Sequence, residues 1–142
     1  MKLSETMKQI IGLAESIRSY WDSELPKRHP KYPIVSPDGD DGPPPAEEQK
    51  LKDLFSSLTE DDIYKTLLTV YLGRGDFDTS DLDGEYGFLK EMFGKSDQAV
   101  SRMVAQAPLG EYLEEGMVEL SRHRIDIDDL RLSAGRVGSR RR

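Results

Sequence analysis

The chain has 142 residues, the length of one domain, and 36% of them are hydrophobic, which is enough to form a folded core. Its formal net charge of −7 argues against a general binder of nucleic acids or anionic membranes, because such proteins need a basic face. The absence of cysteine excludes disulfides, thiolate metal sites and cysteine nucleophiles, and no apolar run reaches the roughly 18–20 residues of a membrane helix, so we expect a cytoplasmic protein without cofactor.

The first predicted element is an amphipathic helix over about residues 5–24. Ser4 has the side chain of an N-cap, and Pro26 is expected to end the helix because proline disrupts a helix interior. The pattern predicts a helix with one apolar face, since hydrophobic residues recur in steps of three and four. These residues are Met7, Ile10, Ile11, Ala14, Ile17, Tyr20 and Trp21.

A proline-rich segment follows the first helix. Residues 26–45 hold seven of the eight prolines, which favours extended and turn conformations over a packed element. A connection of this length in a small domain indicates either disorder with loose wrapping, which we favour, or a strip that binds a partner. Tyr32, Ile34 and Val35 are the residues expected to anchor it.

Residues 46–121 are predicted to form a helical module. Its helices are expected over about 46–57, from a capping box at Thr59 to Gly73, over 81–93, from Ser96 or Asp97 onward, and from Pro108 onward. The helix that ends at Gly73 is apolar nearly all round, so we expect it at the centre of the core. Gly73 is the expected left-handed C-cap of that helix, and Gly75 is expected to turn the chain.

The fold class that these elements predict is all-α. We expect a single irregular bundle of five to six short helices, with a proline-rich extended segment and a disordered basic C-terminal tail. The organisation within this one domain is an N-terminal amphipathic helix, a proline-rich linker, a helical module and a tail, at residues 1–25, 26–45, 46–121 and 122–142.

The tail has a charge opposite to that of the rest of the chain. From Arg122 onward seven arginines stand against three aspartates, a net charge of +4, so residues 1–121 carry −11. A solvated, frayed terminus is the favoured interpretation. The alternative is a basic hook for nucleic acid or for the acidic body of a neighbouring copy, formed by Arg136, Arg140, Arg141 and Arg142.

Two groups of polar residues suggest metal binding but lack the necessary pattern. The acidic string at residues 76–85 resembles a calcium loop, yet Asp81 stands where the loop needs glycine and Gly87 where it needs glutamate. We therefore interpret the string as an acidic cap before the next helix. Glu119 and His123 are four residues apart and are expected to form a surface helix pair. No metal site and no catalytic residue are predicted.

Two further motifs resemble a small bacterial family that is known as a domain of unknown function. The first motif is Leu72-Gly73-Arg74-Gly75-Asp76-Phe77, and the second is Ala107-Pro108-Leu109-Gly110-Glu111-Tyr112-Leu113-Glu114-Glu115-Gly116. Their order and spacing agree with the family over about residues 50–120, whereas Glu111 replaces the Asp that is more frequent there. The resemblance implies a compact helical domain in a bacterial or phage-associated protein, and it implies no activity.

The physical interpretation of these motifs is complementary charge. If the two segments lie side by side, Arg74 is expected to pair with Glu111 or Glu115, with Phe77 and Tyr112 buried next to the pair. The alternative is that Arg74, together with Asp76 and Tyr112, lines a shallow site for a ligand or partner.

Three classes of function are compatible with these residues. The favoured one is a non-catalytic protein-interaction or regulatory module with a protein partner, which includes a homodimer through the apolar surfaces of the first and third helices. The first alternative is a nucleic-acid-linked regulator that uses the tail with Arg102, Arg122 and Arg124. The second alternative is binding of a small anion or metal around Arg74, Asp76, Glu111, Glu115 and His123.

Overall fold

The fold is described from a computed structural model that covers residues 2–34, 39–40, 42–105 and 108–132. Within these ranges the chain forms six α-helices and a short 3-10 turn, and no strand. The helices are α1 (Leu3–Arg28), α2 (Ala46–Ser56), α3 (Glu60–Arg74), α4 (Leu82–Phe93), α5 (Ser96–Ala105) and α6 (Leu109–Arg122), and the turn η1 is Thr79–Asp81. The all-α prediction is confirmed. None of the described helices is both long and apolar enough to cross a bilayer.

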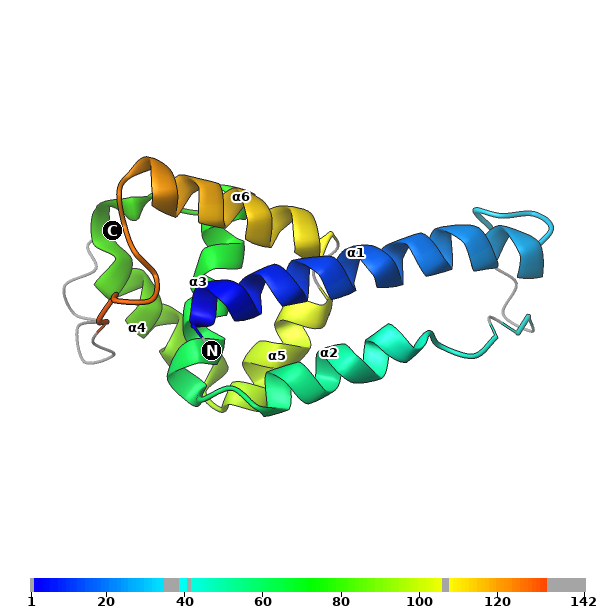
Figure 1. The fold of residues 1–142 in the computed structure, drawn as a ribbon, viewed down its shortest axis with the longest axis horizontal. Helices are drawn as coiled ribbons and strands as arrows, with labels where there is room; N and C mark the ends of the chain where they lie inside the picture. The colour runs from blue at the N-terminus through cyan, green and yellow to red at the C-terminus, as the bar shows by residue number, and fades with distance from the viewer. Residues whose placement is uncertain (1, 35–38, 41, 106–107, 133–142) are drawn as a thin grey trace.

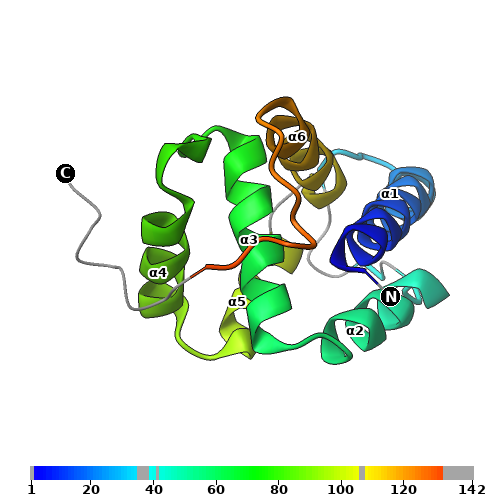
Figure 2. The ribbon, with the colours of Figure 1, turned by 60° about the vertical axis from the view of Figure 1, so that its left-hand side comes forward.

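Helix α3 lies at the centre of the body, as predicted. Figures 1 and 2 show α4 and α5 on one side of it and α6 on the other, with α1 packed against α6 and α2. Every residue from Ile63 to Val70 is buried, since neighbouring helices cover all sides of this segment. Thr59 caps the helix as expected, because its hydroxyl oxygen accepts a hydrogen bond from the Asp62 N–H (3.1 Å).

The crossing of α3 and α6 brings the two backbones into contact. A Cβ on Gly116 would overlap the carbonyl oxygen of Thr69, and a Cβ on Gly73 would overlap the carbonyl oxygen of Tyr112. Gly73 is therefore a helical residue required by close approach, and the expectation that it forms the left-handed C-cap is wrong. Gly75 is the C-cap, with φ of 86°.

Helix α1 is longer than predicted at both ends. Pro26 lies inside its last turn instead of ending it. The turn continues to Arg28 because the His29 N–H still donates to the Leu25 carbonyl (2.9 Å), and because Glu24 pairs with the basic residues of the last turn. The ion-pair distances are 3.4 Å to Lys27 and 3.5 Å to Arg28.

The start of α1 is capped by a residue from the other end of the chain. Ser4 is not the N-cap; it lies in the first turn, and Lys2 occupies the cap position without a side-chain hydrogen bond. The Ser4 N–H donates to Asp128 Oδ1 (2.9 Å), and the Ser4 hydroxyl donates to Asp128 Oδ2 (2.6 Å). The Asp128 carboxylate thus satisfies a donor at the positive end of the helix dipole.

The segment after α1 is anchored by residues other than those predicted. Tyr32 is 41% exposed and Ile34 is 71% exposed, while His29 and Pro45 are buried. Val35 lies outside the described residues. Apolar character alone suggested the wrong anchors, because the chain returns to α2 along α1 and leaves the intervening turn at the far end of the molecule, as Figure 1 shows.

The C-terminal part of the chain packs on the body for longer than predicted. Ile127 is buried, and Ile125, Leu130 and Leu132 lie against the core, although they belong to the segment 122–142 that was interpreted as a tail. These apolar side chains hold residues 125–132 across the start of α1. Arg136, Arg140, Arg141 and Arg142 lie outside the described residues.

Replacement of Gly116 by Ala is expected to lower the free energy of unfolding by about 2 kcal/mol or more, because the added methyl group forces α3 and α6 apart. Gly12→Ala is the matched control: Gly12 lies inside α1 with open space around a Cβ, so this change should raise stability by roughly 0.5–1 kcal/mol. Urea unfolding followed by circular dichroism measures both. Equal effects at the two positions would contradict a backbone contact at the crossing.

Asp128→Ala is expected to destabilise the protein by about 1 kcal/mol at neutral pH, as the loss of an N-cap does. Burial opposes ionisation of this carboxyl, but the hydrogen bonds from Ser4 and Leu3 and the charge of Lys2 outweigh it and lower the pKa below its ordinary value of 3.8. The contribution should therefore be complete above about pH 5 and disappear as the pH falls through the ordinary pKa and then the lowered one. Asp129→Ala, an exposed neighbour, serves as control in the same pH series.

Candidate functional site

The structure brings Arg74 and two of its predicted neighbours together. The Arg74 guanidinium carbon lies 5.8 Å from the ring centroid of Tyr112 and 5.1 Å from that of Tyr71, and Arg74 Nε lies 3.4 Å from Asp76 Oδ2. Phe77 and Tyr112 are half-buried against the core, as expected. The cation stacks on two tyrosine rings and covers the end of the α3–α6 crossing.

The expected ion pair between Arg74 and Glu111 or Glu115 is wrong. Glu111 Oε1 instead accepts from Arg18 Nη1 at 3.0 Å, which links α6 to α1, and Glu115 is exposed on α6. The first turn of α6 lies next to α1, so Glu111 meets Arg18, and Asp76 is close enough to Arg74 in sequence to pair with it. Two tyrosine rings and the Asp76 carboxylate therefore surround the Arg74 guanidinium.

The acidic string before α4 caps helices. Asp78 Oδ1 accepts a hydrogen bond from the Ser80 N–H (2.9 Å), and Asp81 Oδ1 accepts one from the Gly84 N–H (3.1 Å). Within the ranges that the structure describes, no group of three or more His, Cys, Asp and Glu residues is arranged to hold a metal ion. Glu119 and His123 form the expected surface pair, with 3.6 Å between Oε2 and Nε2.

A polar network joins α3 to α4 beside the core. The Tyr86 hydroxyl donates to Asp61 Oδ1 (2.6 Å), and Lys65 Nζ lies 3.1 Å from Asp61 Oδ2. Burial of the ring, with the hydrogen bond to Asp61, raises the pKa of Tyr86 above its ordinary value of 10.0. The phenol thus stays protonated as a donor. The Tyr64 hydroxyl similarly donates to the Gly94 carbonyl (2.7 Å), so this network ties helices together.

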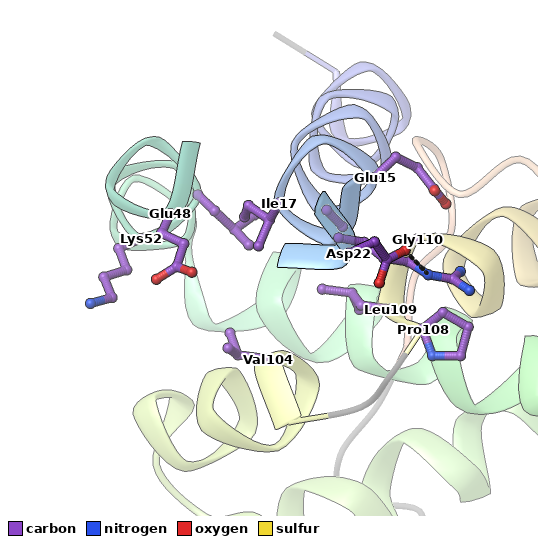
Figure 3. A pocket seen from close by; sticks show the side chains of 12 residues that line it. Glu15, Ile17, Asp22, Glu48, Lys52, Val104, Pro108, Leu109 and Gly110 are labelled. Atoms are coloured by element: carbon purple, nitrogen blue, oxygen red, sulfur yellow. Dashed lines mark ion pairs between the residues drawn. The ribbon is translucent and has the colours of Figure 1, made fainter. Parts of the chain in front are cut away.

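A groove that the sequence pattern did not indicate lies on the other side of the molecule, between α1, α2 and the ends of α5 and α6. It encloses about 590 Å³, within the range of known binding pockets. Figure 3 shows Ile17, Val104 and Leu109 around the hollow from three elements. The apolar lining consists of Ala14, Ile17, Leu51, Val104, Pro108 and Leu109.

Charged side chains surround this apolar lining, with carboxylates in excess. Glu15, Asp22 and Glu48 stand against Arg18 and Lys52. Arg18 pairs with Asp22 on its own helix (4.0 Å) and with Glu111 on α6 (3.0 Å), and we call the charged residues around the apolar lining the rim. Glu15 lies against the start of α6, because a Cβ on Gly110 would come within 2.8 Å of its Oε1.

The groove exists because α1 is longer than the helices that cover it. At about 1.5 Å per residue its 26 residues extend for roughly 39 Å, against about 21 Å for the 14 residues of α6. Only the first turns of α1 contribute fully buried residues, up to Ile10. From Ala14 onward the apolar side of this helix, which we call the apolar stripe of α1, is only partly covered by the rest of the chain. In Figure 1 the C-terminal half of α1 extends past α3–α6.

We call residues 19–28 of α1 the arm. The chain that returns to α2 braces it: the Tyr20 hydroxyl donates to the Pro43 carbonyl (2.6 Å), and Trp21 Nε1 donates to Glu48 Oε2 (2.7 Å). The two aromatic rings also meet edge to face, with 5.0 Å between centroids. These contacts hold the groove wall of α1 and α2 in place without filling the groove.

Comparison of the chain with protein-family models, with curated proteins and with solved structures finds no match. The resemblance suggested by the two motifs stays a prediction. In the structure the two motifs meet: Gly73 of the first motif and Gly116 of the second lie where α3 and α6 cross.

Arg74→Ala is expected to lower the free energy of unfolding by about 1 kcal/mol, since it removes the stacking on Tyr71 and Tyr112. Arg122→Ala is a control of the same type, because Arg122 is 69% exposed and pairs with Glu119 on its own helix; its effect should stay within about 0.5 kcal/mol. Urea denaturation measures both variants. An unchanged stability of Arg74→Ala would indicate a guanidinium that is free for a ligand.

Proposed function

We propose that this protein is a non-catalytic interaction module, and that its groove binds an apolar segment carrying basic side chains. The observation that carries the proposal is the open apolar stripe of α1 opposite Val104 and Pro108. Val104 is 53% exposed, although it faces a hollow lined by other apolar groups. Such a surface gains free energy when a partner covers it.

The charges at the groove support a basic partner segment. Carboxylates outnumber cations around the apolar lining, and residues 1–121 carry a net charge of −11. Basic side chains that flank the apolar contacts of a partner would meet this rim, which favours encounter and orientation more than affinity. A groove walled by helices and rimmed in this way suits a short amphipathic segment.

The contacts of the other candidate residues favour this proposal over the alternatives. Arg102 stacks on Phe93 (5.9 Å) and donates to the Tyr71 hydroxyl (3.3 Å), and Arg122 pairs with Glu119. Self-association through the third helix would lack a surface, because the described residues Ile63–Val70 of α3 are buried. The groove is therefore the surface on which we centre the proposed function.

Selection of 12-residue peptides from a random displayed library against the folded protein tests this function. We expect enriched peptides that combine spaced apolar residues with Lys or Arg, and we expect Val104→Asp to weaken their binding by about tenfold or more. Val118→Asp is the matched control, because Val118 is 42% exposed on α6 outside the groove. Fluorescence anisotropy gives the affinities, and circular dichroism confirms that both variants are folded.

Two outcomes would contradict the proposed function. One is the failure to enrich any peptide at protein concentrations where the chain is monomeric. The other is the enrichment of peptides that bind wild type, Val104→Asp and Val118→Asp equally well, since such peptides use another surface.

A further inference from the structure

The chain itself carries a segment with the chemistry that the groove requires. We call residues 29–34 the tip; it follows the arm at the end farthest from the body (Figure 1). Tyr32 and Ile34 are among its exposed residues, and Ile34, at 71%, is the most exposed large hydrophobic side chain described. Lys31, also exposed, precedes this apolar pair, and no acidic residue lies in the tip.

From these observations we infer that the groove of one copy binds the tip of a second copy, so that two chains form a reciprocal dimer through their arms. This inference rests on the proposed function, because it assumes that the groove is a binding surface, and it names the occupant. Tyr32 and Ile34 supply the apolar contacts for Ile17 and Val104, and Lys31 meets the carboxylates of the rim.

The length of the arm allows both contacts to form at once. Ile17 in the groove and His29 at the start of the tip are twelve residues apart, about 18 Å along a helix. When two α1 helices run antiparallel with a two-fold axis near Ser23, each tip lies level with the groove of the other copy. The same patch is then used on both subunits, as a two-fold interface requires.

The tip is the part of the described chain that the body leaves unsupported. His29 is buried at its base, so the fold fixes where the tip begins, while Tyr32 and Ile34 are exposed. Burial of these two side chains against an apolar surface removes apolar area from water, which favours association. The dimer explains both the exposed pair and the open groove by one contact.

Sedimentation velocity of the full chain over a range of concentrations tests the dimer. We expect wild type to dimerise, and we expect Ile34→Asp and Val104→Asp each to raise the dimer dissociation constant by about tenfold or more. Val118→Asp should dimerise as wild type does. At concentrations where wild type is also monomeric, Ile34→Asp should unfold at the wild-type temperature, because Ile34 is outside the core.

A mixture of the two weakened variants provides the decisive comparison. Ile34→Asp keeps an intact groove and Val104→Asp keeps an intact tip, so a heterodimer regains one complete contact that neither variant has alone. We expect the mixture to sediment as a heterodimer at concentrations where each variant is monomeric. No recovery in the mixture would overturn the pairing of tip and groove, as would a dimer that neither substitution weakens.

The outcomes separate this inference from the proposed function. A wild-type chain that is monomeric at every concentration, while library peptides still bind the groove, overturns the dimer and leaves the interaction module. If the chain is monomeric and no peptide binds at Val104, both are overturned. Dimerisation lost on deletion of residues 133–142, with Ile34→Asp unaffected, would assign the occupant to the tail and overturn the inference.

Discussion

The rest of the fold depends on the backbone contact between α3 and α6. At Gly73 and Gly116 no side chain separates the two helices, so α6 lies directly on α3. With α6 there, and α4 and α5 on the other side, the segment Ile63–Val70 is closed off from water. The position of α6 also fixes the start of that helix beside α1, where Arg18 meets Glu111 and one wall of the groove is formed.

The local signals of the sequence predicted the helices well and their ends less well. The 3.6-residue pattern identified the helices, and Thr59 marked a true cap because capping is a contact between near neighbours. Ser4 and Gly73 were misassigned because their roles are set by distant partners: Asp128 caps α1 from 124 residues away, and α6 determines why position 73 is glycine. Pro26 was misread as the end of α1, because the loss of its one backbone donor does not stop the helix: the His29 N–H still donates to the Leu25 carbonyl (2.9 Å).

For the candidate site, the sequence predicted a contact between the two motifs and missed the contact that a third segment, α1, makes with one of them. Arg74 and Tyr112 were expected to meet and do so, whereas the partner of Glu111 depended on the path of α1. The sequence pattern could not predict the groove, because the hydrophobic periodicity of α1 is the same whether its own chain or a partner covers the apolar stripe. The available signal was length: Ala14 and Ile17 lie on a stripe longer than the helices beside it.

The central claim is that the open end of this stripe is a binding surface for the tip of a second copy. The most direct measurement places the photo-crosslinking amino acid p-benzoylphenylalanine at Val104 and irradiates a mixture of isotopically light and heavy chains. Mass spectrometry of the digested product is predicted to show mixed light–heavy crosslinks from position 104 to residues 29–34. Crosslinks found only within one chain, or to segments other than the tip, would contradict the account.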